Sequence, residues 1–280
     1  MVFNMEIIEI IKDAFVFPSK NLGTFSIYVV LSILAGAFAV GGSFLYLVGL
    51  IDSESFLMGG IALIISMLIG WVLSGYLISV IKSGIDLDDE VPEFEWWDNF
   101  ITGFNNFIVA IVYFIIPAFI VAVVGYITNI YGNITTVVLE TISQTLNVLL
   151  GVTSGSAALD IIFPAIVNLV ISLAVTITVA LILFIIFSFL QTMAEARLAN
   201  TGSLREALNI FEAAKDIKRI GVRKVIIVIV LLIVIVGVIQ MVLSTIFGYV
   251  PILSVLSIII TPYLLFFTQR AVGLLYSDIA

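Results

Sequence analysis

The most constraining feature of this sequence is a series of long runs that contain no charged side chain. Six runs occur, each near or above the roughly 20 residues that a helix needs to cross the hydrocarbon core of a bilayer. Their approximate limits are 22–50, 56–81, 105–128, 161–190, 225–247 and 251–269. With 62% hydrophobic residues and 11% charged residues, the chain has more apolar surface than a water-soluble fold buries. We therefore expect an all-α polytopic helical bundle, with residues 1–280 forming a single integral membrane domain.

The basic residues orient the six predicted spans. Lys and Arg beside a span are retained on the cytoplasmic side of the membrane. With the N-terminus inside, all 11 fall in cytoplasmic segments: Lys12, Lys20, Lys82, Arg197, Arg205, Lys215, Lys218, Arg219, Arg223, Lys224 and Arg270. Most of them lie in one basic loop, residues 191–224. We therefore expect both termini in the cytoplasm.

The predicted outer loop, residues 129–160, contains an apolar stretch that resembles a seventh span. Polar side chains interrupt it, and its apolar residues recur at helical spacing, as in a helix that lies in the membrane interface. A seventh span would also move the basic loop to the outside. We therefore expect an interfacial helix. Asn133-Ile134-Thr135 in this loop has the form of a glycosylation acceptor, a triplet that is common by chance.

Three cytoplasmic stretches, near residues 6–14, 94–104 and 203–219, have the pattern of amphipathic helices, and each precedes a pair of spans. Ser203 and Glu206 have the form of a capping box at the start of the third. The predicted apolar face of this third helix consists of Leu204, Leu208, Phe211 and Ala214. The arrangement predicts a threefold internal repeat of interfacial helix, span and span.

The composition excludes several classes of function. The chain has no Cys and no His, which removes thiol nucleophiles, Cys/His zinc sites and imidazole acid–base catalysis. A net charge of −8 argues against a nucleic-acid partner. We expect no enzymatic activity and no cofactor. The expected partners are membrane lipids and an unidentified protein.

Two charged clusters are candidate sites. The first is the acidic run Asp86, Asp88, Asp89 and Glu90. Its carboxylates suit a hard cation, but the spacing fits no EF-hand loop, and a hydrated charge run is the favoured interpretation. Docking on the basic stretch 215–224 is a further alternative. The second cluster is Lys218, Arg219, Arg223 and Lys224, which either attracts anionic lipid headgroups or only fixes the topology.

Polar residues inside the spans form stripes at helical spacing. The stripes are Asn168, Ser172 and Thr176 in the fourth span and Gln240 and Ser244 in the fifth. Such residues either hydrogen-bond between packed helices or line a solute path, and the first use is the commoner one. Small residues at Ser66, Gly70 and Ser74 predict a close helix approach in the second span.

Several of these segments together resemble a known family. They are the stretch 75–82, the acidic run with Pro92, Phe94 and Trp97 after it, the stretch 199–203, and the closing stretch 270–276 after Pro262. On these residues the chain resembles a prokaryotic, mainly archaeal, family of multipass membrane proteins, domain of unknown function 4013. The resemblance implies an archaeal or bacterial plasma-membrane protein, and it brings no assigned activity or catalytic residue.

Two functions fit the sequence. The first is a non-enzymatic membrane component that interacts with lipids or proteins. The second is a transporter or channel-like permease, which the repeat, the polar stripes and the prolines at 117 and 262 favour. The absence of ionisable residues within the predicted spans argues against an ion-coupled carrier. We therefore favour the first function.

Overall fold

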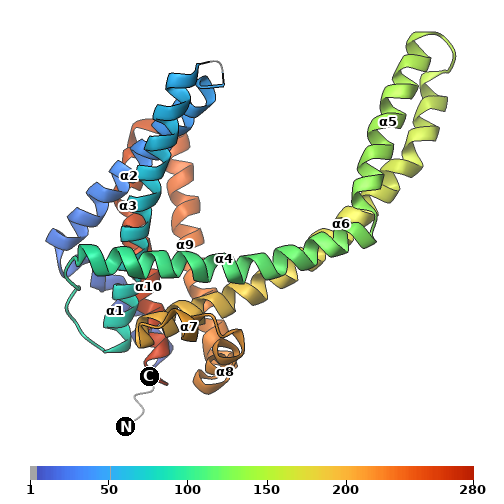
Figure 1. Ribbon diagram of the computed structural model, residues 1–280. Coiled ribbons are helices and arrows are strands. Elements are labelled where there is room, and N and C mark those ends of the chain that lie inside the picture. Colours follow the sequence, from blue (N-terminus) through green and yellow to red (C-terminus); the bar gives the residue numbers. More distant parts are fainter. Residues whose placement is uncertain (1–4, 51) are drawn as a thin grey trace. The chain divides into compact units, whose positions relative to one another are not determined.

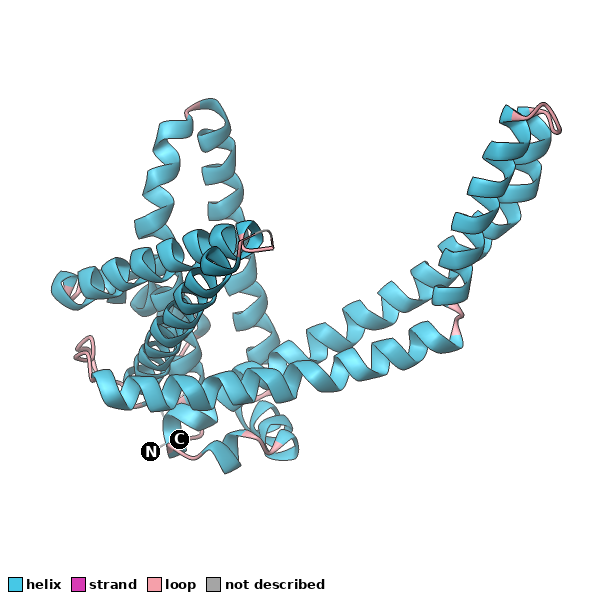
Figure 2. Cartoon of the chain, turned by 45° about the horizontal axis from the view of Figure 1, so that its top comes forward, coloured by secondary structure: helices cyan, strands magenta, loops and turns pink. Residues whose placement is uncertain are grey.

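The computed structural model describes residues 5–50 and 52–280, which form helices joined by turns and loops, with no strand among them (Figures 1 and 2). The helices are α1 (Ile7–Val16), η1 (Phe17–Ser19), α2 (Leu22–Val48), α3 (Ser53–Ile85), α4 (Trp96–Ile127), α5 (Ile130–Leu149), α6 (Gly155–Thr201), α7 (Leu204–Ala207), α8 (Ile210–Ile220), α9 (Val222–Tyr249), η2 (Pro251–Leu256) and α10 (Ser257–Tyr276). The predicted all-α fold class is confirmed.

Six helical segments within the described residues are long and apolar enough to cross a membrane. They are α2, α3, α4, α6, α9 and the segment Pro251–Tyr276, which combines η2 with α10. The predicted number of spans is therefore confirmed. The helix α5, which covers most of the stretch that resembles a seventh span, does not belong to this set.

The chain divides into two compact units. The first comprises Met1–Ala110 and Leu190–Ala280, and the second comprises Ile111–Phe189. Helices α4 and α6 each contribute to both. In the first unit α3 packs along α2 and against α10, and α10 also contacts α1. Aromatic rings fill this contact: the Tyr28 and Phe266 rings lie 5.0 Å apart, and Tyr76 stacks on Phe94 at 4.3 Å.

In the second unit, α5 packs against α6. Asn129, in the left-handed conformation (φ 55°), separates α5 from α4. The Asn133 side chain then donates hydrogen bonds to the Ser172 hydroxyl at 3.1 Å and to the Asn168 carbonyl oxygen at 3.3 Å. These bonds attach the first turn of α5 to α6.

The predicted threefold repeat is not confirmed. Short helices precede the α2–α3 pair and the α9–α10 pair, namely α1 and α8. The predicted second member, around residues 94–104, instead forms the first turns of α4, which continues without interruption to Ile127. The middle pair therefore has no separate amphipathic helix.

Two glycines set the distance between α3 and α4. A Cβ atom added to Gly75 would overlap the Asn99 carbonyl oxygen, and one added to Gly103 would overlap the Trp71 carbonyl oxygen. Helix backbones approach this closely only where side chains are absent. The predicted small-residue face is used in part, because the Ser66 hydroxyl bonds the Ala35 carbonyl at 2.8 Å.

A Gly75→Ala variant is expected to destabilise the first unit by about 1–3 kcal/mol, because a methyl group cannot fit without moving α4. The matched control is Gly70→Ala on the same helix, where a Cβ would meet no atom within 4 Å. The control should be neutral or stabilising, since alanine favours a helix. Unfolding by sodium dodecyl sulfate in mixed micelles, followed by circular dichroism, measures both. Equal stabilities would contradict the close α3–α4 contact.

Candidate functional site

Two buried arginines organise the polar residues of the first unit. Arg270 of α10 is 1% exposed and Arg197 of α6 is 8% exposed. A buried guanidinium is stable only where carboxylates and other acceptors replace its water. The partners of each arginine therefore show which segments the fold brings together.

Arg270 joins segments that are far apart in the sequence. Its Nε donates to Oδ1 of Asp13 in α1 at 2.9 Å. Its Nη1 donates to the Asp88 carbonyl oxygen at 2.6 Å and to the Ser83 hydroxyl at 3.3 Å. The guanidinium also lies 4.4 Å from the centre of the Phe17 ring, a cation–π contact. The end of α10 is thereby tied to α1 and to the end of α3.

The turn after α3 presents the Asp88 carbonyl to Arg270. Leu87 adopts the left-handed conformation (φ 55°), and the Asp88 N–H donates back to the Ser83 carbonyl oxygen at 2.9 Å. This is the Schellman arrangement that ends many helices, here with leucine where glycine is usual. Gly273 allows α10 to lie close to α3, because a Cβ there would overlap a carbonyl oxygen of α3.

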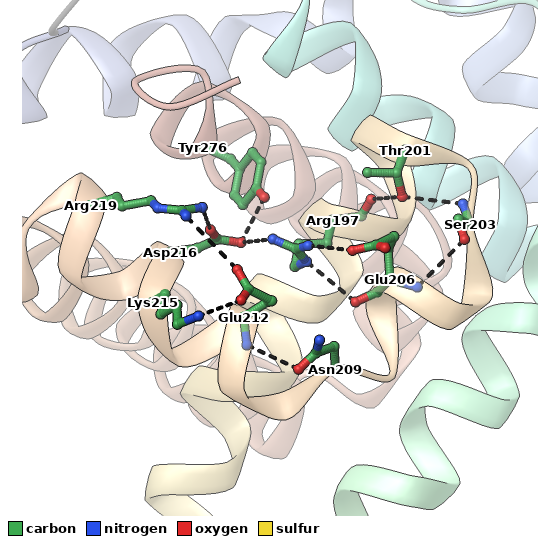
Figure 3. Close-up of polar contacts among 10 residues, drawn as sticks. All are labelled: Arg197, Thr201, Ser203, Glu206, Asn209, Glu212, Lys215, Asp216, Arg219 and Tyr276. Atoms are coloured by element: carbon green, nitrogen blue, oxygen red, sulfur yellow. Dashed lines mark hydrogen bonds and ion pairs between the residues drawn. The ribbon is translucent and has the colours of Figure 1, made fainter.

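Arg197 forms a second network with α7, α8 and α10 (Figure 3). Its Nη1 donates to Oδ2 of Asp216 at 2.7 Å, and its Nη2 donates to Oε2 of Glu206 at 2.8 Å. The Asp216 side chain is only 1% exposed and accepts two more hydrogen bonds. They come from the Tyr276 hydroxyl at 2.8 Å and from Arg219 Nη1 at 3.1 Å. A buried carboxylate is thus held by two guanidinium groups and a phenol.

Local sequence determines where α7 and α8 begin and end. Gly202, with φ 63°, directly follows the end of α6. Gly221, with φ 109°, separates α8 from α9. The side chains of Ser203 and Asn209 each accept a hydrogen bond from the backbone N–H three residues further on. Both are N-cap interactions, which start helices by satisfying exposed donors. These turns position Asp216 against Arg197.

Helix α8 has two unlike faces. The inner, buried face consists of Ala213, Asp216 and Ile220. The exposed outer face consists of Phe211, Lys215 and Lys218. Spacings of three and four residues place each set on one side of the helix. Phe211 is 83% exposed, so the outer face combines an aromatic ring with positive charge.

The four cations predicted to meet lipid headgroups divide into two pairs. Arg219 belongs to the network of Figure 3, and Lys224 forms an ion pair with Asp278. Lys218 and Arg223 are exposed, and neither forms an ion pair within the described residues. The second pair is thus free to attract an anion.

The predicted acidic run, residues 86–90, contacts Arg270 and Lys20. The Asp89 carboxylate lies 2.8 Å from Lys20, whose hydrogen bond and charge lower the pKa of that carboxyl. The Asp88 contribution to Arg270 comes from its backbone. In the part of the chain that the structure describes, no three of these carboxylates form a group that could hold a metal ion. The partners of the run lie outside the basic stretch 215–224.

The polar stripes have different surroundings. Ser172 and Thr176 are buried in the second unit, where the Thr176 hydroxyl lies 3.1 Å from the Thr128 hydroxyl. Together with the Asn133 bonds to Ser172 and to the Asn168 carbonyl, this bond joins neighbouring helices. Gln240 and Ser244 are exposed on α9, where the Ser244 hydroxyl bonds a carbonyl of its own helix.

Sequence reasoning missed the buried ion pairs. It used Arg197 and Arg270 only as topology signals and singled out neither Asp13 nor Asp216 as their partner. One signal was present: Asp216 shares its helix face with Ala213 and Ile220, which are small or apolar. A carboxylate on such a face requires a partner.

Comparison with known proteins places the chain in a family. Residues 58–248 match a family model described as a protein of unknown function, DUF4013. No curated protein and no solved structure matches the chain. The matched region contains Gly75, Arg197 and Asp216, so it includes the α3–α4 contact and the core of the second network. The chain therefore belongs to the DUF4013 family of proteins of unknown function.

Proposed function

We propose that the protein is a non-enzymatic component of the prokaryotic plasma membrane, with both termini in the cytoplasm, that binds anionic phospholipid headgroups through α8 and the start of α9. The observation that carries this proposal is the outer face of α8. There an exposed aromatic ring and exposed cations lie on a helix that buried ion pairs hold in place.

The charges available to a lipid are those without a carboxylate partner. Lys215 is held 2.6 Å from Glu212, and its hydrogen bond lowers the pKa of that carboxyl. Lys218 and Arg223, which form no ion pair in the described parts of the chain, are left to attract phosphate. Each basic residue near an anionic membrane surface contributes about 1 kcal/mol.

A largely apolar groove lies next to Arg223, and its lining includes one acidic side chain, Glu6. It has a volume of about 750 Å³ and is lined mainly by α1 and the start of α9, including Ile7, Ile8 and Ile227. Arg223 and Lys224 also line it. A phospholipid has the matching chemistry, because its acyl chain suits the isoleucines while its phosphate suits the arginine.

The test compares a Lys218→Gln/Arg223→Gln double variant with the unchanged protein. Short-chain phosphatidylglycerol and phosphatidylcholine are titrated onto detergent-solubilised protein, and native mass spectrometry measures each bound lipid. At about 1 kcal/mol per charge, the variant should lose roughly thirtyfold of its preference for phosphatidylglycerol. Glycerol phosphate without acyl chains should bind much more weakly than the lipid.

The matched control is Lys12→Gln/Arg205→Gln, which removes two other exposed cytoplasmic cations. This control should keep the lipid preference. An equal loss in both double variants would mean that only net charge matters, which contradicts a site on α8. If the Lys218→Gln/Arg223→Gln variant binds lipid unchanged but loses a cross-linked protein, the partner of this surface is a protein and not a lipid.

A further inference from the structure

The start of α4 has a polar side. Glu95, which directly precedes the helix, and Asp98, Thr102 and Asn105 follow one another at spacings of three and four residues, which places them on one side. A different side carries the aromatic and aliphatic residues Trp97, Ile101 and Phe104, which are exposed as a membrane-facing surface would be. A polar helix face next to a membrane requires water, protein or a ligand to satisfy it.

This polar side faces a pocket of about 220 Å³ in the first unit. Helix α3 contributes Ser79 and Lys82, and α6 contributes Leu198, Ala199 and Gly202. The glycine contact between α3 and α4 at Gly75 holds the two polar walls in place. The pocket volume suits a small molecule.

One buried side chain in the pocket lacks a partner. Asn99 is 2% exposed and lines the pocket, and its Oδ1 accepts a hydrogen bond from the Ser79 hydroxyl at 3.1 Å. Its Nδ2 has no hydrogen-bond partner within the described residues. Whichever way the amide is turned, one of its two polar atoms stays unsatisfied, which is costly in a buried group. As oriented, Asn99 offers a donor to an acceptor such as a carboxylate oxygen.

The charges of the pocket are of both signs. Lys82, Glu95 and Asp98 line it together, and none of the three takes part in an ion pair within residues 5–50 and 52–280. A molecule that carries both signs would satisfy them. One cation and two anions are complemented by one carboxylate and two cationic groups.

We propose that this pocket binds a small zwitterion of the basic amino-acid class. Lys82 and the Asn99 amide receive the carboxylate, and Glu95 and Asp98 receive the ammonium groups. The inference is independent of the proposed lipid site, because the two sites share no residue.

The test uses three probes that differ by one charged group each. L-Lysine carries all three groups, L-norleucine lacks the side-chain ammonium, and cadaverine lacks the carboxylate. Isothermal titration calorimetry of the full chain in nanodiscs measures binding. L-Lysine is expected to bind most tightly, and each analogue is expected to bind at least about tenfold more weakly.

Variants assign each group to its partner. Lys82→Met should weaken L-lysine about tenfold, because the carboxylate contact is lost, and should not weaken cadaverine, because a repelling cation is removed. Asp98→Asn should weaken both. Asn99→Asp keeps the side-chain shape and should repel the carboxylate of L-lysine. Lys12→Met and Glu93→Gln, at exposed positions outside the pocket, are the matched controls for the first two.

Two results would overturn the proposal. The first is no saturable binding of L-lysine at millimolar concentration, which would leave the pocket as a site for water only. The second is L-lysine binding that Lys82→Met and Asp98→Asn leave unchanged, which would place the ligand elsewhere. Both substituted residues are exposed, so these variants are expected to fold and the test stays decisive if Asn99→Asp does not.

Discussion

Replacement of Arg270 by methionine is expected to lower the free energy of unfolding by about 3–5 kcal/mol. The substitution leaves the Asp13 carboxylate, the Ser83 hydroxyl and the Asp88 carbonyl without their shared donor. Methionine fills a similar volume, so the loss reports the polar partners more than a cavity. Unfolding by sodium dodecyl sulfate in mixed micelles, followed by circular dichroism, measures the change.

Two further variants make this prediction specific. Lys12→Met removes an exposed cation from α1 and should change stability by less than about 0.5 kcal/mol. Arg270→Lys keeps the charge but loses the planar fork of donors, so it should fall between the methionine variant and the unchanged protein. An Arg270→Met protein as stable as the original would show that the buried arginine is not a structural tie.

The second large effect is expected at Asp216. Asp216→Leu should cost about 3–5 kcal/mol, because Arg197 stays buried with only Glu206 as an ionic partner. Arg197→Met should also be destabilising, since it removes a hydrogen-bond donor from the Asp216 carboxylate, which is only 1% exposed. The double variant should cost less than the sum of the two, because neither charge then remains without its partner.

A double-mutant cycle measures this coupling directly. A coupling energy of about 1–3 kcal/mol is expected for residues in one network. The matched cycle pairs Arg197→Met with Asp278→Leu, whose side chain bonds Lys224 and not Arg197. Additive effects at Arg197 and Asp216 would contradict the geometry of Figure 3.

The helices themselves were predictable because span length and lack of charge are local properties. Runs such as 22–50 and 225–247 correspond closely to α2 (Leu22–Val48) and α9 (Val222–Tyr249). Helix starts are also local: Ser203 forms the N-cap predicted for it, by accepting a hydrogen bond from the Glu206 N–H. The Glu206 side chain, however, bonds Arg197 instead of completing a capping box.

The faces of the amphipathic helices were predicted less well. The sequence places Leu204, Leu208 and Phe211 on one apolar side of a continuous helix. The structure instead ends α7 at Ala207, restarts at the Asn209 cap, and leaves Phe211 83% exposed. Apolar periodicity assumes that charges face water, and that assumption fails where a buried Arg197 faces Asp216. The contact with Arg197 is what holds the Asp216 side of α8 inward.

The polar pocket at the start of α4 is visible in the sequence only in part. The spacing of Asp98, Thr102 and Asn105 is visible in the sequence as the complement of the apolar side of the same helix. The contribution of α3 and α6 is not visible, because no local pattern relates Ser79 to Asn99 or to Gly202. A contact across different helices needs the packed structure.

The tie between Asp13 and Arg270 joins residues 257 positions apart, and Tyr263 donates to the Phe15 carbonyl across 248 positions. At about 5–20 residues per second, a ribosome needs roughly 13–51 s to add the 257 residues that separate Asp13 from Arg270. Throughout that time the first helix has been made and its partner has not. The contact of the N-terminal helix therefore stays unfinished while the chain between the two helices is synthesised, and a nascent chain stopped before α10 can never complete it.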